Sequence, residues 1–276
     1  MTATHDDLVR ADLAAVRDAI RTGAYERHTA GLAKGFLQAN LAILPSVYAL
    51  DFLRFCQRNP KPCPVVGVSD TGDPMLATLG DAIDVRTDVP RYRVFRNGAH
   101  VDDVGDIKAL WRDDFVAVAL GCSFTFEHAL QAAGIHMRHI DRDTTVAMYR
   151  TNRPLVPAGP FTGTMVVSMR PIKVEEVDRT VEICRAFPLA HGAPIHVGDP
   201  SAIGIDRIDR PDYGDPTPID AGEVPVFWAC GVTPQNVILN ARPEICITHV
   251  PGHMLITDIA ETADIPVYQH TQGSPS

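Results

Sequence analysis

The chain has 276 residues, 45% hydrophobic and 21% charged, which is ordinary for a folded globular protein and excludes disordered and fibrous classes. Its formal net charge of -9, with no run of Lys or Arg, argues against nucleic acid as a partner. No apolar stretch approaches the ~20 residues that a membrane span requires. An acidic amino terminus and six cysteines without a CxxC pair predict a cytoplasmic protein with free thiols.

Helical and extended patterns alternate along the chain. Helical spacing of apolar residues predicts a helix over 6–22 and another over 45–59, whereas 31–45 fits either a helix or a helix leading into an extended segment. Residues 63–70 predict a buried strand, and Asn97-Gly98 predicts a hairpin. Further strands are expected at 115–120, 164–169, 225–229, 245–249 and 254–258, and further helices near 124–133 and 174–187.

This mixture of elements predicts an α/β layer joined to an α+β portion. We expect one compact domain over residues 1–276, with a smaller α+β subdomain within about 120–220. The Pro/Gly-rich stretch 152–163 and the Asp/Pro-rich stretch 198–222 are either subdomain borders or ordered loops.

The stretch VALGCSFTFEHAL, residues 118–130, predicts a strand, a tight turn and a helix. Free backbone N–H groups at a helix start attract anions and stabilise a thiolate, so Cys122 is a candidate reactive group. Glu127 follows Ser123 by four residues, one more than a capping box requires. Cys122, Ser123 and Glu127 are therefore candidate ligand contacts, and a buried cysteine beside an ordinary Ser N-cap is the alternative.

A second cysteine has a similar setting in PVFWACGVTPQ, where Cys230 stands between Ala and Gly after an apolar run. Two cysteines at strand ends can face one substrate. The alternative is that Cys230 simply packs before a Gly turn.

Histidines gather in two loops of the last third of the chain, FPLAHGAPIHVGDP with His191, His196 and Asp199, and ITHVPGHMLITD with His249 and His253. The Pro-Gly pair in the second loop forbids a helix, which excludes the helical two-histidine metal motif. Three roles stay open for these loops. Their His, Asp and Cys side chains can bind a divalent metal ion, the histidines can act as general acids or bases, or the histidines can make structural hydrogen bonds.

Arginines in MYRTNRP and VVSMRPI are candidate anion-binding groups. The guanidinium groups of Arg150 and Arg170 suit bidentate capture of a carboxylate, and Asn152 lies beside Arg150. An anionic substrate would need such a cationic pocket on an acidic chain. Surface ion pairs are the alternative role.

Several long blocks together carry a resemblance: GFLQANLAILP, DFLRFCQRNPKPCPV, DVRTDVPRYRVF, GCSFTFEHAL, MYRTN, VVSMRPI, HGAPIHVGDP, PVFWACGVTPQ and ITHVPGHMLITD. From about residue 10 to 259 the chain resembles the hydro-lyase family also called the D-glutamate cyclase family (YcsI-like). The resemblance implies a three-layer α/β/α body, a smaller two-layer α+β part and a mixed sheet.

The resemblance also implies a carbon–oxygen lyase acting on a small carboxylic or amino acid. Conversion of D-glutamate to 5-oxo-D-proline and dehydration of a β-hydroxy acid both expel water, and both need a base, an acid and donors for a developing oxyanion. The catalytic candidates are Cys122, Glu127, His191, His196 and Cys230, and the substrate-binding candidates are Ser123, Arg150, Asn152, Arg170, Asp199, His249 and His253. We expect their loops to converge into one cleft.

Two other functions stay open: a cysteine-dependent amino-acid isomerase that uses Cys122 and Cys230 as two bases, and a small-acid binding protein without turnover. The pattern demands no cofactor, although a divalent metal is an option. The expected partner is a small acidic molecule, without nucleic acid or membrane, and the expected assembly is a homo-oligomer, with a homodimer as the candidate.

Overall fold

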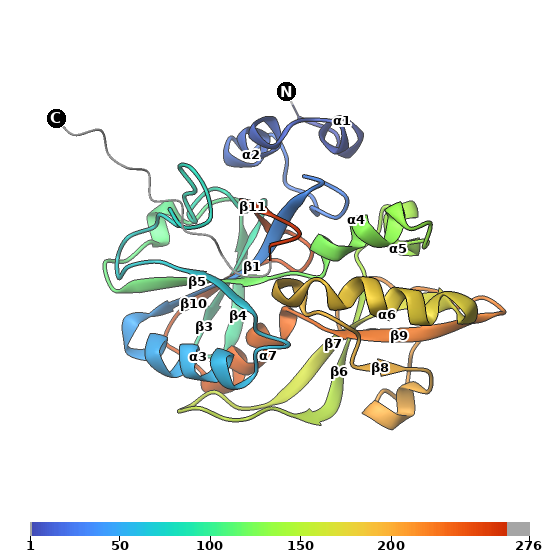
Figure 1. Ribbon diagram of the computed structural model, residues 1–276. Helices are drawn as coiled ribbons and strands as arrows, with labels where there is room; N and C mark the ends of the chain where they lie inside the picture. Colours follow the sequence, from blue (N-terminus) through green and yellow to red (C-terminus); the bar gives the residue numbers. More distant parts are fainter. Residues whose placement is uncertain (1, 264–276) are drawn as a thin grey trace.

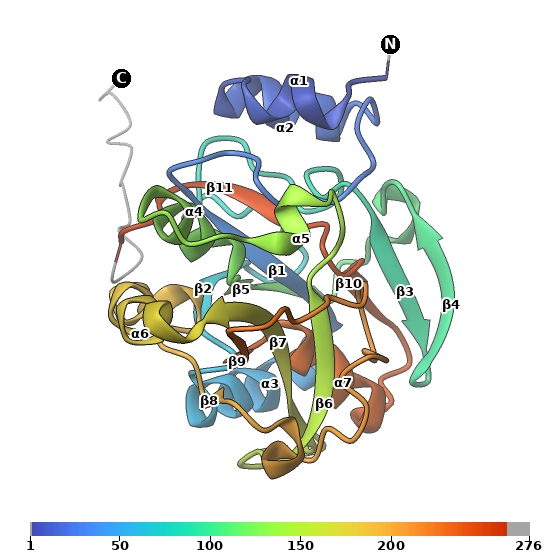
Figure 2. The same ribbon diagram turned by 90° about the vertical axis from the view of Figure 1, so that its right-hand side faces the viewer.

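The framework of the protein is a pair of β-sheets, seen in a computed structural model that describes residues 2–263 (Figures 1 and 2). The large sheet has seven strands, in the order β2-β5-β1-β10-β3-β4 with β11 also paired to β1. Its strands are β1 (Phe36–Pro45), β2 (Val65–Val68), β3 (Tyr92–Arg96), β4 (Ala99–Val104), β5 (Phe115–Gly121), β10 (Cys246–His249) and β11 (Leu255–Ala260). The small sheet has the order β6-β7-β9-β8, with β6 (Ala147–Pro154), β7 (Thr164–Lys173), β8 (His196–Val197) and β9 (Glu223–Ala229).

Helices connect and cover the strands. The α-helices are α1 (His5–Val9), α2 (Leu13–Arg21), α3 (Ser46–Arg58), α4 (Phe124–Ala132), α5 (Arg138–Asp141), α6 (Val177–Arg185) and α7 (Val232–Ala241). Short 3-10 helices are η1 (Lys108–Leu110), η2 (Val174–Glu176), η3 (Pro188–Ala190) and η4 (Pro200–Ile203). Most predicted strands and helices are thus confirmed, including the hairpin at Asn97-Gly98, which joins β3 and β4.

Strand β1 is the centre of the large sheet. It pairs along one edge with β5 and along the other with β10 and β11, and its residues from Leu37 onward are buried. A strand covered on both faces is expected to read as a continuous apolar run. Two polar side chains, Gln38 and Asn40, interrupt that run while remaining buried.

The two faces of the large sheet are covered differently. One face packs on α3 and α7, with Phe52, Phe55 and Ile238 in its core. The other packs on the long segment between β2 and β3, which contributes residues such as Leu76 and Leu79. The α/β class is confirmed, but the layers at this sheet are helix, sheet and loop, where helices had been expected on both faces.

The expected mixed sheet needs a second correction, because each strand pair in the described residues is antiparallel. The β1–α3–β2 pattern is typical of neighbouring parallel strands. In this fold β1 and β2 do run parallel, but β5 lies between them and pairs antiparallel with both.

The helix predicted over 6–22 is wrong in one respect. The segment forms α1 and α2, and the break comes where the side chain of Asp12 accepts a hydrogen bond from the backbone of Ala15 and caps α2.

In the small sheet, one face packs on α4 and α6 around Phe126, Cys184 and Trp228. The opposite face packs on the segment around Ile203 and Ile205. Phe227 and Trp228 are neighbours on β9 and point to opposite faces, as alternation along a strand requires. Whether a side chain lies near α4 or on the far face of this sheet therefore depends on its place in the strand.

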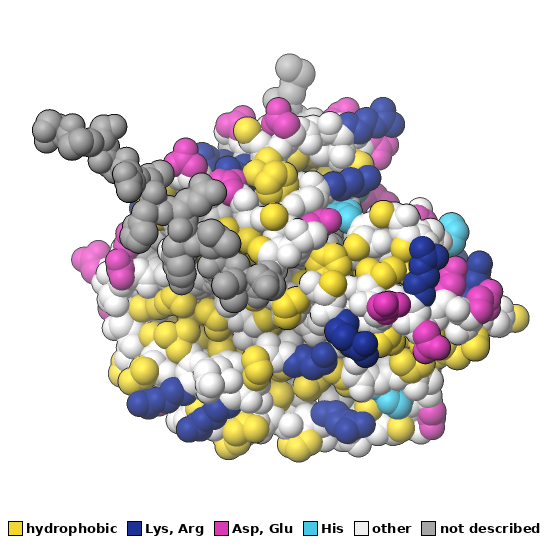
Figure 3. All heavy atoms as spheres, in the orientation of Figure 1, with side chains coloured by type: hydrophobic (Ala, Val, Ile, Leu, Met, Phe, Trp, Pro, Cys, Tyr) yellow, Lys and Arg dark blue, Asp and Glu magenta, His cyan; other side chains and the backbone are white. Residues whose placement is uncertain are grey.

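Among the residues 2–263, the helices are all too short or too polar to cross a lipid bilayer. On the face drawn in Figure 3, acidic and basic side chains both occur, interspersed with apolar ones.

Candidate functional site

Two turns of similar construction meet between the sheets. In the first, β5 ends at Gly121, Cys122 follows, and α4 starts at Phe124; in the second, β9 ends at Ala229, Cys230 follows, and α7 starts at Val232. We call residues 121–123 and 229–231 the two cysteine turns. Cys122 and Cys230 are both buried and belong to the same apolar cluster, and the charge of one thiolate would raise the pKa of the other thiol. The fold thus brings the two cysteines into one cluster, and that they face a common substrate stays a prediction.

The side chain of Asn40 joins the two cysteine turns. Its Nδ2 donates hydrogen bonds to the carbonyl oxygens of Leu120 and Gly121, at 3.2 and 2.9 Å. On the second turn, a Cβ atom placed on Gly231 would lie 1.9 Å from Asn40 Nδ2, far inside van der Waals contact. Glycine is therefore required at position 231 because the backbone there packs directly on the amide of Asn40.

Behind the first cysteine turn lies a buried ion pair between Glu127 of α4 and Arg170 of β7. Arg170 Nε donates to Glu127 Oε1 at 2.9 Å, Arg170 Nη2 contacts the same oxygen, and His139 Nε2 lies 3.1 Å from it. All three side chains are at most 2% exposed. The other carboxylate oxygen, Glu127 Oε2, is buried without a hydrogen-bond partner.

Arg170 is held from every side. Its Nη2 donates to Ser123 Oγ and its Nη1 to Ser168 Oγ, both at 3.0 Å. The guanidinium carbon lies 5.3 Å from the ring centre of Phe126 and 5.2 Å from that of Trp228, which are cation–π distances. Most donors of Arg170 are thus occupied by protein groups. The hydroxyl of Ser123 makes no N-cap hydrogen bond, so the capping alternative for this residue does not occur.

The charges in this region follow from burial and contacts. Burial by itself would raise the pKa of Glu127, but His139 and Arg170 outweigh it and hold the pKa at about 2. Burial raises the pKa of Cys122 to about 12 and that of Cys230 to about 11, although backbone amides at the helix starts and the charge of Arg170 act in the opposite direction. At neutral pH the carboxyl is ionised and both thiols are protonated. The thiols can donate protons, whereas Glu127 cannot act as a general acid.

His191 borders the first cysteine turn. A Cβ atom on Gly121 would lie 1.6 Å from the carbonyl oxygen of Leu189, so the segment that carries His191 packs on this turn. His191 Nδ1 donates to the carbonyl oxygen of Lys61 at 2.8 Å, and Nε2 is buried without a partner. The pKa of His191 is lowered to about 4, chiefly by burial and to a smaller extent by the positive charges of Lys61 and Arg170. The ring is neutral at neutral pH, with the lone pair of Nε2 free to accept a proton.

His249 lies near the second cysteine turn. Its Nδ1 accepts a hydrogen bond from the backbone of Leu41 at 3.1 Å, and Gln235 of α7 donates to its carbonyl oxygen at 2.9 Å. Burial lowers the pKa of His249 to about 3, so the ring is neutral, and a backbone hydrogen bond occupies its Nδ1. His253 is half-buried and its Nδ1 donates to the carbonyl oxygen of Pro251 at 3.1 Å.

Two predicted candidates, His196 and Asp199, do not meet the cysteine turns. The ring of His196 lies 5.7 Å from that of Phe227, centre to centre, on the face of the small sheet opposite to Trp228. Its Nε2 donates to the carbonyl oxygen of Asp199 at 2.7 Å. The carboxylate of Asp199 accepts from Ser201 and caps η4.

Arg150 and Asn152 are also away from the turns. Both are exposed on β6, where Arg150 donates to the hydroxyl of Tyr213 at 2.9 Å. The convergence predicted from sequence therefore covers Cys122, Ser123, Glu127, Arg170 and Cys230, with His191 and His249 at its border.

The cysteine turns are closed to solvent, so the open cleft expected there is not observed. A cavity of about 490 Å³ opens elsewhere, at the outer end of β7, and includes Arg138, Lys173, Glu176 and Glu223 in its lining. Within this lining, Arg138 pairs with Asp220 at 2.8 Å and with Glu223 at 2.7 Å. A substrate could reach the buried cysteine turns only through local opening of the structure.

Sequence reasoning missed three residues of this region. Asn40 did leave a signal, since a buried apolar run with an amide in it is unusual. Ser168 also left one, because it precedes Arg170 by two residues and so shares its face of β7. His139 left no signal, because it lies on a four-residue helix and reaches Glu127 through the fold.

Comparison with known proteins identifies the family. The sequence profile of the D-glutamate cyclase family, described as "D-glutamate cyclase", matches residues 116–258, just over half of the chain. The chain belongs to the D-glutamate cyclase family. The matched segment runs through Cys122, Glu127, Arg170 and Cys230, so this family unit contains both cysteine turns.

Relatives of similar length share the family. A protein of Jannaschia sp. (strain CCS1) named "Putative hydro-lyase" is 65% identical over 259 residues, covering 94% of this chain and 97% of its own. A similarly named protein of Ruegeria pomeroyi is 60% identical and covers 99% of both chains. A solved nitrogen repressor-like protein of Methanococcus jannaschii overlaps with a TM-score of 0.38 at 11% identity, over 83% of this chain and 90% of its own, which is too small a likeness to argue from.

Proposed function

We propose that the protein is a hydro-lyase acting on a small carboxylic or amino acid, and that it converts D-glutamate to 5-oxo-D-proline and water. The names of the family and of its relatives favour this class of reaction. The observation that carries the proposal is the pair of buried, protonated thiols at the starts of two helices, joined through Asn40.

The reaction has definite proton requirements. The α-amino nitrogen attacks the distal carboxyl carbon, a C–N bond forms, a C–O bond breaks, and hydroxide leaves as water. One group must accept a proton from the amine and another must donate a proton to the leaving oxygen. We assign the donor role to the protonated thiol of Cys122 or Cys230 and the acceptor role to neutral His191, whose Nε2 is free. While the site is buried, the thiols are weak acids and the imidazole is a weak base.

The helix starts supply the remaining requirement. Backbone N–H groups at the amino ends of α4 and α7 carry partial positive charge, which stabilises a carboxylate or a developing oxyanion. Amides of Phe124 and Val232 already interact with the sulfurs of Cys122 and Cys230. Both helix starts therefore direct donors toward the place where we expect the reacting carboxyl group.

Arg170 and Glu127 act behind this site as positioning residues. Arg170 ties Ser123 of the first cysteine turn to α4 and β7 through hydrogen bonds of 3.0 Å or less. Its charge also lowers the pKa of both thiols relative to burial alone. We assign these two side chains the task of fixing the turn and its electrostatic field.

A cysteine-dependent isomerase is the second candidate function, because Cys122 and Cys230 share one apolar cluster. A two-base isomerase removes the α-proton of an amino acid with one thiolate and returns a proton from the other thiol. Exchange of the α-proton with solvent is therefore required in an isomerase but plays no part in cyclisation.

Proton NMR in heavy water distinguishes these functions. The purified protein is incubated with D-glutamate, L-glutamate and small β-hydroxy acids, in parallel with 5-oxo-D-proline. Our proposal predicts ring closure of D-glutamate with the α-proton retained. Loss of the α-proton signal without ring closure would establish the isomerase instead. A rise in melting temperature with D-glutamate but without any product would show a binding protein and refute catalysis.

A further inference from the structure

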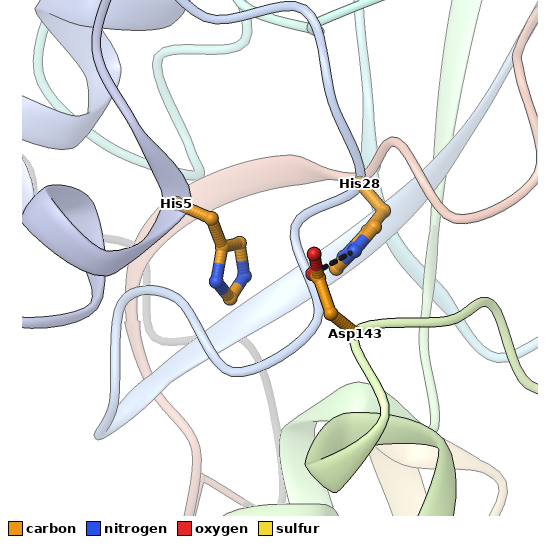
Figure 4. Close-up of side chains that lie close together, drawn as sticks. All are labelled: His5, His28 and Asp143. Carbon is orange, nitrogen blue, oxygen red and sulfur yellow. Dashed lines mark hydrogen bonds and ion pairs between the residues drawn. The ribbon is translucent and has the colours of Figure 1, made fainter.

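A cluster of metal-ligating side chains lies outside the cysteine turns, formed by His5, His28 and Asp143 (Figure 4). The three residues come from the start of α1, the segment before β1 and the segment after α5. Each offers one ligand atom, and these atoms all lie within 4.8 Å of one another. The two imidazole rings are 5.0 Å apart, centre to centre.

Local structure fixes each member of the cluster. Thr4 and Asp7 form a capping box that starts α1 at His5, and His5 Nε2 lies 2.9 Å from the carbonyl oxygen of Ala30, to which it donates. The hydroxyl of Tyr25 donates to the carbonyl oxygen of His28 at 2.6 Å. His5 therefore keeps Nδ1 as its lone-pair nitrogen, which is the form that binds a metal ion.

Asp143 is held in an unusual conformation. Its φ is +53°, in the left-handed region that non-glycine residues seldom adopt, although Asp and Asn do so more readily than others. One carboxylate oxygen accepts from Arg27 Nη2 at 2.5 Å and the other lies 2.9 Å from His28 Nε2. Arg27 thus orients the carboxylate and leaves one oxygen directed into the cluster.

His28 is not satisfied by protein contacts alone. Its side chain is 11% exposed, and Nδ1 is buried without a hydrogen-bond partner. The other ring nitrogen, Nε2, faces the carboxylate of Asp143 at 2.9 Å, so Nε2 is the atom that His28 offers to an ion.

We propose that His5, His28 and Asp143 bind a divalent transition-metal ion of the Zn²⁺ type. Two imidazoles and one carboxylate are a common donor set for zinc, with the fourth position open to water or substrate. In a tetrahedral site with bonds of about 2.0–2.1 Å, neighbouring ligand atoms lie about 3.3 Å apart. The 2.9 Å separation of His28 Nε2 and Asp143 needs to widen only slightly when a cation replaces the shared proton.

Such an ion would tie the amino-terminal helix to the region of the cysteine turns. Asp143 lies two residues beyond α5, and α5 carries His139, which contacts Glu127 at 3.1 Å. The ion would therefore fix the segment that positions His139, while the binding itself does not depend on the reaction proposed above.

Calorimetric titration of the full chain with Zn²⁺, after removal of metal with a chelator, tests the site. We expect one saturable site in the unsubstituted protein. Asp143→Asn keeps the shape of the side chain and tolerates the left-handed backbone, so it should fold normally and weaken Zn²⁺ binding by at least about tenfold. His28→Ala should weaken Zn²⁺ binding by more than about 100-fold, because this substitution removes a ligand. Loss of a group that only orients a ligand already lowers metal affinity by about 10- to 100-fold.

His136→Ala is the matched control, since His136 is 81% exposed and lies 3.8 Å from Asp141 without a third ligand in the described residues. It should bind Zn²⁺ like the unsubstituted chain. The proposal is overturned if no saturable site is found, or if Asp143→Asn, with an unchanged melting temperature in the absence of metal, binds as tightly as the unsubstituted chain. Because no substrate is present, this result is separate from success or failure of the hydro-lyase assay.

Discussion

Replacement of Glu127 by Gln removes the carboxylate that compensates the buried guanidinium of Arg170. Both side chains are 1% exposed, so water cannot take over the role of the lost charge. Breaking a buried ion pair by neutralising one partner typically costs about 3–5 kcal/mol. The pKa of Glu127 gives an independent figure: a fall from an ordinary 4.5 to about 2 corresponds to roughly 3 kcal/mol of folding free energy. We therefore expect Glu127→Gln to lower the free energy of unfolding by about 3 kcal/mol or more.

Urea unfolding followed by tryptophan fluorescence measures this loss, and Trp228 lies 5.2 Å from Arg170 and reports directly on the pair. The pH dependence has a definite sign. Because the pKa of Glu127 is lower in the folded state, its contribution is complete above about pH 4.5 and is lost as the pH falls toward 2. The unsubstituted protein should lose stability over this interval more steeply than Glu127→Gln. A loss below about 1 kcal/mol at neutral pH, with parallel pH profiles, would refute the reasoning.

Two further predictions concern the cysteine turns. Gly231→Ala forces a Cβ to within 1.9 Å of Asn40 and should destabilise the fold by about 1–3 kcal/mol in the same urea assay, whereas Gly105→Ala, whose Cβ would be 3.5 Å from its nearest neighbour, should change little. Because burial raises the pKa of Cys122 and Cys230, iodoacetamide at pH 8 should alkylate both far more slowly in the folded protein than in urea, as mass spectrometry of peptides would show. Equal rates in the two states would contradict the burial of the thiols.

Local patterns predicted local structure well. The apolar run over 115–120, followed by Gly and a helical pattern, corresponds to β5, the first cysteine turn and α4. The same logic placed Cys230 before α7. In both cases the signal lies within about a dozen residues, where periodicity and turn chemistry decide the backbone.

Local sequence patterns could not predict which distant strands pair with one another. Strand β5 inserts between β1 and β2 by pairing with residues 70 to 82 positions away on β1 and 50 to 55 positions away on β2. This insertion makes the sheet antiparallel where a mixed sheet was expected. The contact between Asn40 and Gly231, and that between His139 and Glu127, arise from the same packing. Conversely, His196 resembled a site residue in sequence, but its ring packs beside Phe227 and its Nε2 donates to the carbonyl oxygen of Asp199, three residues away.

The most direct test of the central claim is the rate at which Cys122→Ala and Cys230→Ala form 5-oxo-D-proline from D-glutamate, compared with Cys246→Ala. Cys246 is also buried but belongs to the core under α3 and α7. If the two cysteine turns form the catalytic centre, loss of the proton-donating thiol should lower kcat by about 100-fold or more, with a smaller effect on KM, and Cys246→Ala should stay near the unsubstituted rate. Unchanged kcat in both turn variants would contradict the account.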